Sequence, residues 1–329
     1  MKIKTIISRR KYQKHHAWQL VYEWEDVFHE QMTAPYSLNF DIASLAEKYR
    51  IYKHLPIAWM WKYKPAFVFE MVPTNERFTP HNNSPYVVPC IIDWYSRTEE
   101  EMKSFFESFS KHKIVLVTSR QVYCWLQTIN APMKFGHLPL SLSDKWKITE
   151  NTSYEKDIDI VLMGRQNPVL LGWLKQYQEK HPDIMVATSR RQDDNYNYYT
   201  QDGKLVGNAK THEQCMSLLR RSKVSFYSTK GMDDDYGSIN TNGFSQVTPR
   251  FFESLAAGNH VIARYMDNED TEYFELKSIC PHTDSYESFE KQMDMALQEP
   301  VNMKLYSDYL KKHYTSTRVK MLEEIVADL

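Results

Sequence analysis

The sequence predicts an α/β protein with two doubly wound domains. Its 329 residues suit two domains of ordinary size. Short apolar runs alternate with amphipathic stretches along most of the chain, which is typical of βαβ units and parallel sheets. A stretch that contains two prolines, a glycine and a polar tail, Asn130 to Ser153, interrupts this alternation. We interpret it as the linker between the domains.

In the first half, β-strand-like runs are expected at Ile3–Ile7, Ala66–Met71, Tyr86–Ile92 and Lys113–Thr118. Helical periodicity is found at His16–Gln31, Ile42–Tyr52, Thr98–Ser110 and Gln121–Ile129. We therefore expect residues 1–145 to form an amino-terminal Rossmann-like domain.

A second series of strands is expected at Ile158–Met163, Ile184–Ala187, Lys223–Tyr227 and His260–Ala263. Helices are expected at Pro168–Lys180, Thr211–Arg221, Pro249–Ala257, Tyr286–Leu297 and Met303–Asp328. The polar tract from Arg190 to Gly207 is assigned no element. Residues 146–329 would form the second Rossmann-like domain, whose last helix could pack back on the first. Two such sheets facing one another would place ligands at the carboxyl ends of the strands, in the cleft between the domains.

Composition excludes few functions. Lys plus Arg (41) nearly balance Asp plus Glu (42), so net charge gives no argument for a nucleic-acid partner. The four cysteines are far apart and form no CxxC pair, which argues against a metal or disulfide framework and favours the cytoplasm. No apolar run approaches the roughly 18 residues that span a bilayer. A peripheral membrane contact is left open.

The segment TPRFFESLAAG, Thr248 to Gly258, is the most informative motif. Thr248 suits the N-cap of a helix and Pro249 its first position, while Gly258 supplies a left-handed stop. Arg250 and Glu253, three residues apart, would project from one face. A cation beside a carboxylate suits a ligand with an anionic end and a hydroxyl-bearing end, such as a nucleoside diphosphate. The alternative is a surface ion pair on an ordinary helix.

A second motif is DIDIVLMGRQNP, Asp157 to Pro168. Gly164 lets the backbone turn sharply and approach a ligand, and Arg165 follows it in the turn. The helix beginning at Pro168 points its positive end into the same space, which outlines an anion site. The alternative is a turn that is merely structural.

Together these motifs resemble the carboxy-terminal domain of GT-B glycosyltransferases, most closely the group-1 transferases of the CgeB type. The resemblance covers roughly Asp157 to Leu297 and includes a closing helix expected at Thr315–Leu329. The amino-terminal half matches only in its alternation of strands and helices. It implies the GT-B fold, in which two Rossmann-like domains face a central cleft. It further implies a hexosyltransferase-like enzyme that uses a UDP- or GDP-sugar as donor, with no cofactor and no metal.

The resemblance also implies residue roles. Glu253 would accept hydrogen bonds from the ribose hydroxyls, and Arg250 and Arg165 would pair with the pyrophosphate. The remaining candidate donor-site residues, taken from their position in the motifs or after a strand, are Gly164, Ser228, Lys230 and Thr248. One departure is Ser245, which stands where many retaining relatives carry a glutamate. The stereochemical outcome is therefore left open.

The resemblance implies that the amino-terminal domain, residues 1–145, binds the acceptor. Asp93 follows a strand of this domain in CIIDWYS and is the candidate general base of an inverting transferase. Its alternative role is to cap the following helix. His15 and His16 follow the first strand and could line the acceptor side. A basic cluster near them (Arg9, Arg10, Lys11 and Lys14) could meet an anionic acceptor or lipid phosphate. The acidic runs Asp193-Asp194 and Asp233-Asp234-Asp235 are interpreted as solvated loops, not metal ligands.

The predicted function is transfer of a sugar from a nucleotide diphosphate donor to a growing surface glycan or a lipid-linked acceptor. Three alternatives remain open. A sugar-nucleotide epimerase would share the donor site, a DNA-modifying glucosyltransferase would need a basic track, and a scaffold protein could bind the nucleotide without catalysis.

Overall fold

The computed structural model describes residues 2–10, 16–36, 67–74, 85–95, 98–192, 195–233, 241 and 243–329. The chain divides into two compact units. The first unit comprises Met1–Asp144, Ile239–Phe244 and Tyr314–Leu329, and the second comprises Lys145–Ser238 and Ser245–His313. The short helix η2 (Asp144–Trp146) spans the boundary between them in the sequence.

The first unit contains a parallel sheet with the strand order β1-β2-β3-β4-β5 in its described part. These strands are β1 (Ile3–Ile7), β2 (Phe67–Thr74), β3 (Val87–Asp93), β4 (Val115–Val117) and β5 (Phe135–His137). The helices among the described residues of this unit are η1 (His16–Trp18), α1 (Gln19–Met32), α4 (Glu99–Phe109), α5 (Arg120–Thr128) and α14 (Thr315–Ala327).

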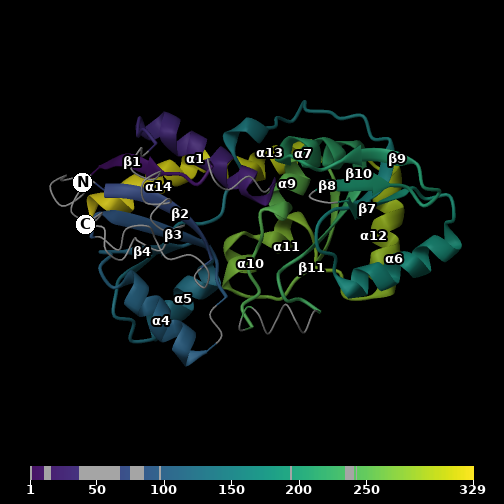
Figure 1. Ribbon diagram of the computed structural model, residues 1–329. Helices are drawn as coiled ribbons and strands as arrows, with labels where there is room; N and C mark the ends of the chain where they lie inside the picture. Colours follow the sequence, from purple (N-terminus) through teal and green to yellow (C-terminus); the bar gives the residue numbers. More distant parts are fainter. Residues whose placement is uncertain are drawn as a thin grey trace. The chain divides into compact units, whose positions relative to one another are not determined.

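Helices cover both faces of this sheet. On one face, buried aromatic and aliphatic residues of α4 and α5, among them Phe105 and Leu126, pack against Val72, Ile91 and Val115. On the other, α1 and α14 lie side by side (Figure 1). The carboxy-terminal helix is therefore part of the first unit, although it follows the second unit in the sequence.

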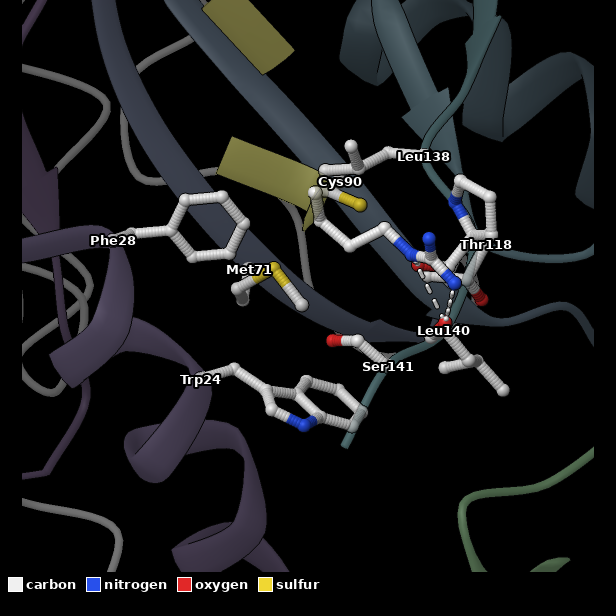
Figure 2. Close-up of a pocket in the computed structure, with 10 residues that line it drawn as sticks. Trp24, Phe28, Met71, Cys90, Thr118, Leu138, Leu140 and Ser141 are labelled. Carbon is white, nitrogen blue, oxygen red and sulfur yellow. Dashed lines mark hydrogen bonds between the residues drawn. The ribbon is translucent and has the colours of Figure 1, made fainter. Parts of the chain in front are cut away.

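A small pocket lies between α1, α14 and the sheet of the first unit (Figure 2). Trp24 of α1 lines it together with Met71 and Cys90 of the strands. The buried Arg318 of α14 closes it and donates from Nη2 to the carbonyl oxygen of Leu140 at 2.9 Å. About 10 Å³ is open to the centre of a water molecule, which is room for about one water. The pocket is thus part of a packed interior.

The second unit contains a sheet with the order β11-β10-β6-β7-β8-β9. Its strands are β6 (Ile158–Leu162), β7 (Val186–Gln192), β8 (Asn195–Tyr199), β9 (Leu205–Asn208), β10 (Ser222–Ser228) and β11 (His260–Arg264). The helices in the part of this unit that the structure describes are α6 (Pro168–Lys180), α7 (His212–Arg221), α9 (Arg250–Ala256), α10 (Glu269–Tyr273), α11 (Leu276–Ile279), α12 (Tyr286–Gln298) and α13 (Met303–Leu310).

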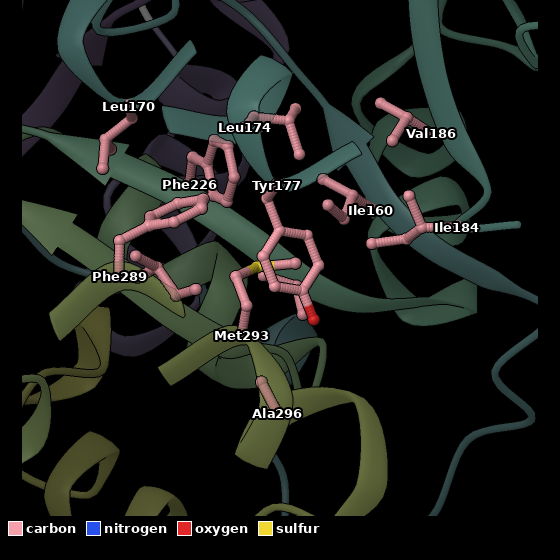
Figure 3. Packing of buried hydrophobic residues seen from close by; sticks show 12 residues of the cluster. Ile160, Leu170, Leu174, Tyr177, Ile184, Val186, Phe226, Phe289, Met293 and Ala296 are labelled. Carbon is pink, nitrogen blue, oxygen red and sulfur yellow. The ribbon is translucent and has the colours of Figure 1, made fainter. Parts of the chain in front are cut away.

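The strand order of the second unit reverses between β6 and β10. Strand β7 lies on one side of β6, whereas β10 and β11 lie on the other, and all four are parallel. Helices α6 and α12 pack on one face around a cluster that includes Leu174, Phe226 and Phe289 (Figure 3). Helices α7 and α9 contact the sheet from its other face. In sheets of this kind ligands bind outside the carboxyl ends of the strands where the order reverses.

The alternation of side chains along β10 explains this layering. Val224 and Phe226 belong to the α6–α12 cluster. The intervening Ser225 bonds Ser254 of α9, with 2.9 Å between the two hydroxyl oxygens. Tyr227 packs against Phe251 with ring centroids 5.2 Å apart. Successive residues of a strand point to opposite faces, so a continuous apolar run with one small polar residue serves both layers.

The predicted α/β class with parallel sheets and covering helices is confirmed in both units. Three element predictions are wrong. The stretch interpreted as a linker contains β5, which completes the first sheet. The polar tract from Arg190 to Gly207 holds most of an antiparallel extension, β7-β8-β9. The single helix expected over Met303–Asp328 is two helices, α13 and α14, of which α14 agrees with the closing helix expected at Thr315–Leu329. The helix expected at Ile42–Tyr52 lies outside the described residues.

Candidate functional site

The β6–α6 turn has the geometry that its sequence predicts. Gly164 adopts φ 75°, a left-handed conformation that side chains disfavour. Asn167 caps α6, because its side-chain oxygen accepts from the backbone N–H groups of Val169 and Leu170 at 3.0 and 3.1 Å. Pro168 takes the first helical position. The turn therefore brings an exposed glycine to the carboxyl end of β6, at the strand reversal.

Helix α9 begins one residue later than its sequence predicts. Pro249 occupies the N-cap position, and no side chain caps the helix. Thr248 is not the cap. Its carbonyl oxygen accepts from the backbone N–H of Phe251 at 3.1 Å, which opens the helix with a tighter turn. Gly258 has φ 65° and ends the helix as expected.

Arg250 connects α9 to the β6–α6 turn. A Cβ atom placed on Gly164 would lie 3.9 Å from Nη2 of Arg250. The other terminal nitrogen, Nη1, lies 3.2 Å from Oε2 of Glu253. Nη1 is shielded from solvent and makes no hydrogen bond within the described part of the chain. The site thus places a guanidinium close to a turn that carries no side chain.

Glu253 is buried and charged. Burial alone would raise the pKa of its carboxyl, but Arg250 and a hydrogen bond from His212 outweigh burial and bring the pKa to about 2. His212 Nε2 lies 2.9 Å from Glu253 Oε1. One carboxylate oxygen therefore contacts the imidazole and the other the guanidinium, so the carboxylate is held on both sides.

Two more buried side chains lie within the electrostatic reach of Arg250. Burial raises the pKa of Tyr198 on β8 to about 12, while Arg250 and the backbone of Gly164 act in the opposite direction. Burial raises the pKa of the Cys215 thiol on α7 to about 11, again opposed by Arg250. Strand β8 and helix α7 thus complete the surroundings of the guanidinium.

The remaining predicted donor-site residues lie at the same edge of the sheet. Arg165 is exposed in the turn directly after Gly164. Ser228 ends β10, the parallel neighbour of β6. Two residues further, the backbone N–H of Lys230 donates to the carbonyl oxygen of Gln246 at 3.3 Å. The second unit therefore brings these segments together, with Gly164 and Arg250 in direct proximity.

Ser245, the residue in place of a glutamate, is part of the interior of the second unit. Its hydroxyl lies 2.7 Å from that of Thr229, and both residues are buried. Asn268 donates to its carbonyl oxygen at 2.9 Å. The position thus stabilises the loop after β10.

The acidic run that begins at Asp233 has a structural role at its first residue. Arg264 bonds both carboxylate oxygens of Asp233 at 2.6 and 2.9 Å, and Asn167 donates to it at 2.9 Å. The hydrogen bond from Arg264 is the main reason that the pKa of Asp233 is lowered. Asp193, Asp194, Asp234 and Asp235 lie outside the described residues. The described ranges contain no group of three acidic, histidine or cysteine residues that could hold a metal.

Asp93 ends β3 in the first unit and is partly exposed. The hydroxyl of Tyr95 donates to Oδ2 at 3.4 Å, near the limit for a hydrogen bond. The alternative role of Asp93 as a helix cap is wrong, because Thr98 and Glu101 form the capping box of α4.

The basic cluster after β1 forms internal ion pairs. Arg9 pairs with Glu70 at 2.9 Å, and both side chains are buried. Arg10 pairs with Asp26 at 2.7 Å. His15, Lys11 and Lys14 lie outside the described residues, and for His16 only its backbone place at the start of η1 is described. The two described arginines therefore stabilise the first unit.

Sequence reasoning missed His212, Tyr198 and Cys215. A signal for His212 was present, because His212, Cys215, Met216 and Leu219 follow the i, i+3, i+4, i+7 spacing of a buried helix face. A histidine in such a stripe requires a polar partner. Tyr198 had no comparable signal, since its strand lay in the tract assigned no element.

No family model matches the sequence, and no curated protein sequence matches it. Solved structures with some similarity include a trehalose-phosphate synthase (UDP-forming) from Burkholderia xenovorans. Its identity is 8% and its TM-score 0.46, covering 95% of this chain and 84% of that one. A TarM variant of S. aureus in complex with fondaparinux, α-GlcNAc-glycerol and UDP has 11% identity and a TM-score of 0.42, covering 81% of this chain.

The glycosyltransferase SnogD from Streptomyces nogalater has 11% identity and a TM-score of 0.41, covering 98% of this chain and 99% of that one. The chain spans 55% of the TarM chain. Because these similarities are low, function is inferred from this chain's own side chains. Within the described part of the chain, no helix is long and apolar enough to cross a membrane.

Proposed function

We propose that the second unit binds a nucleotide diphosphate sugar and that the protein is a glycosyltransferase. The observation that carries this proposal is the Arg250 guanidinium, held by Glu253 beside the Gly164 turn where the strand order reverses. A cation at this place in the sheet suits a phosphate group, and the glycine, which has no side chain, gives the phosphate close access to the backbone.

The diphosphate would lie against the Arg250 guanidinium and the β6–α6 turn. A guanidinium matches phosphate oxygens as a planar fork, which a lysine ammonium does not. Arg165, adjacent to Gly164 in the turn, would add a second charge. Negative charge grows on the diphosphate as the glycosidic bond breaks, and cations already in place stabilise it without reorganisation. Transfer would then proceed without a metal, with UDP or GDP as leaving group.

Glu253 would bind the ribose of the donor. Its low pKa keeps the carboxylate ionised at neutral pH. A carboxylate has about four lone-pair sites, and His212 and Arg250 each approach one oxygen. Capacity therefore remains to accept hydrogen bonds from ribose hydroxyls.

Asp93 of the first unit would act as general base toward the acceptor hydroxyl. Its position at the carboxyl end of β3 and its partial exposure support this role. The acceptor would be a glycan or a lipid-linked sugar. The acceptor oxygen would bond to the anomeric carbon of the donor sugar as the bond from that carbon to the diphosphate breaks. Its proton would pass to Asp93 and the diphosphate would leave, which completes an inverting transfer.

A thermal-shift screen tests the donor site. The ligands are UDP, GDP, UMP, GMP, uridine, guanosine and a panel of UDP- and GDP-sugars. A ligand that binds only the folded protein at 100 times its Kd adds about 2.7 kcal/mol to the free energy of unfolding. We expect one diphosphate series to raise Tm, with the monophosphate and nucleoside following in decreasing order. An unchanged Tm with every nucleotide would contradict the proposed function.

A non-catalytic nucleotide-binding scaffold is the second candidate, favoured by the interior position of Ser245 where retaining relatives carry a glutamate. A sugar-nucleotide epimerase would use the same donor site. Product analysis separates them. A scaffold leaves the nucleotide sugar intact, an epimerase converts it without an acceptor, and a transferase releases UDP or GDP when the acceptor is present.

A further inference from the structure

His212 lies behind the candidate donor site, on the side of Glu253 away from Arg250. We propose that His212 is a positioning residue, which holds Glu253 and, through it, orients the Arg250 guanidinium toward the diphosphate. This inference rests on the proposed function of the same site. It adds a residue that touches neither nucleotide nor sugar.

The three side chains are connected through the carboxylate of Glu253, which contacts His212 on one side and Arg250 on the other. His212 Nε2 lies 2.9 Å from Glu253 Oε1, and Arg250 Nη1 lies 3.2 Å from Glu253 Oε2. A carboxylate with a pKa of about 2 only accepts at neutral pH. The Nε2 atom of His212 therefore carries the proton and donates. This assigns the tautomer from the chemistry of its partner.

The imidazole itself is fixed from two directions. Trp146, buried in η2, meets it edge to face, with ring centroids 5.5 Å apart and an interplanar angle of 83°. The backbone at residue 212 is fixed because it directly follows Thr211, whose capping box with Gln214 begins α7. A side chain held by packing and backbone can fix the carboxylate that it contacts.

Loss of the imidazole N–H would leave the Glu253 carboxylate free to move. Glu253 Oε1 would become a buried acceptor without its partner, which costs about 1–3 kcal/mol. The carboxylate would then rotate or draw the guanidinium toward its free oxygen. Either change moves Arg250 away from the Gly164 turn. Affinity for the diphosphate should fall, whereas contacts to the nucleobase should persist.

Two variants of His212 test this role. His212→Leu removes the donor and keeps a side chain of similar bulk, whereas His212→Gln restores an N–H near the place of Nε2. Calorimetric titration with UDP, GDP, uridine and guanosine gives the affinities of the wild type and of each variant. We expect His212→Leu to weaken diphosphate binding about tenfold. Nucleoside binding should weaken by a clearly smaller factor, because a nucleoside keeps the ribose contact to Glu253 but has no phosphate for Arg250. His212→Gln should recover most of the loss.

The Arg250→Ala background completes the experiment. If His212 acts through Arg250, His212→Leu adds little to the loss that Arg250→Ala already causes, because coupled residues are not additive. Wild-type affinity in His212→Leu would overturn the inference, as would an equal loss for nucleoside and diphosphate, which is the pattern of a purely structural histidine. If the Leu variant does not fold, His212→Asn, with a displaced donor, replaces it in the same comparison. A wild type that binds neither UDP nor GDP overturns the proposed function itself, and the role of His212 with it.

Discussion

The guanidinium of Arg250 lies against Gly164, with Nη2 3.9 Å from the place where a Cβ atom would stand. Gly164 adopts a left-handed backbone conformation, and Arg250 is at the first position of a short helix from a distant part of the chain. A cation and a turn without a side chain therefore share one edge of the sheet. Both residues can be changed separately, with different expected results.

Arg250→Ala should weaken the binding of UDP or GDP by about 10- to 100-fold, because a hydrogen bond to a charged group contributes about 1.5–3 kcal/mol. Nucleoside affinity should change by much less. Arg221→Ala is the matched control, since Arg221 forms a partly exposed ion pair with Asp157, which precedes β6. Calorimetric titration measures each affinity. Equal losses for nucleoside and diphosphate would contradict the phosphate role of Arg250.

Gly164→Ala should destabilise the protein by about 1–2 kcal/mol, because a residue with a Cβ atom is strained in the left-handed region. It should also weaken diphosphate binding. Gly172→Ala in α6 provides the contrast, since nothing lies within 4 Å of a Cβ atom there. This change should stabilise the helix by about 0.5–1 kcal/mol. Urea denaturation measures both effects, and a Gly164→Ala variant as stable as wild type would contradict the assignment of strain.

Asp93→Asn should abolish sugar transfer while leaving the affinity for the donor within about twofold of wild type. Asparagine keeps the shape of the side chain but cannot take the proton of the acceptor hydroxyl. The measurements are initial rates of transfer and calorimetric titration of the donor. Unchanged turnover would remove Asp93 from the mechanism.

The low pKa of Glu253 predicts an acid-sensitive contribution to stability. Burial would raise this pKa, but Arg250 and His212 lower it from its ordinary value of 4.5 to about 2. Because the folded state binds this proton more weakly than the unfolded state, the contribution is present above pH 4.5 and is lost as the pH falls toward 2. The difference in unfolding free energy between wild type and Glu253→Gln should therefore shrink between pH 5 and pH 3. A difference that stays constant would contradict the ionised pair.

Glu25 in the first unit should show the opposite dependence. Its burial raises its pKa to about 8, against the effects of Ser8 and Arg10. The stability that it contributes is therefore present below pH 4.5 and is lost as the pH rises toward 8. The free energy of unfolding of Glu25→Gln should therefore rise relative to that of the wild type between pH 5 and pH 8, measured by denaturation at each pH.

Regular elements with apolar periodicity could be predicted from the sequence, and irregular or polar ones could not. Both ends of helix α6 were predicted correctly, and Asn167 and Pro168 mark its start in the sequence. Strand β5 was missed because only Phe135 of its three residues is buried and the strand lies at the sheet edge. Strand β8 was missed because asparagine and tyrosine carry little hydropathy signal, although its ladder with β7 is regular.

For the candidate site, the local motifs were predictable and their buried partners were not. The left-handed glycines, Gly164 and Gly258, followed from sequence. The proximity of Gly164 and Arg250 depends on the strand order, which no local pattern encodes. His212 was missed because its partner, Glu253, lies on another helix. The roles of Arg165, Ser228, Lys230 and Asp93 stay predictions.

The pair of hydroxyls between Ser225 and Ser254 sets a limit on how this protein can vary. Both residues are buried, and the 2.9 Å contact brings helix α9 close to strand β10. A bulky side chain at either position would push the helix outward and lift its first residue, Arg250, from the edge of the sheet. A substitution at this contact would therefore impair the candidate site from a position in the interior of the second unit.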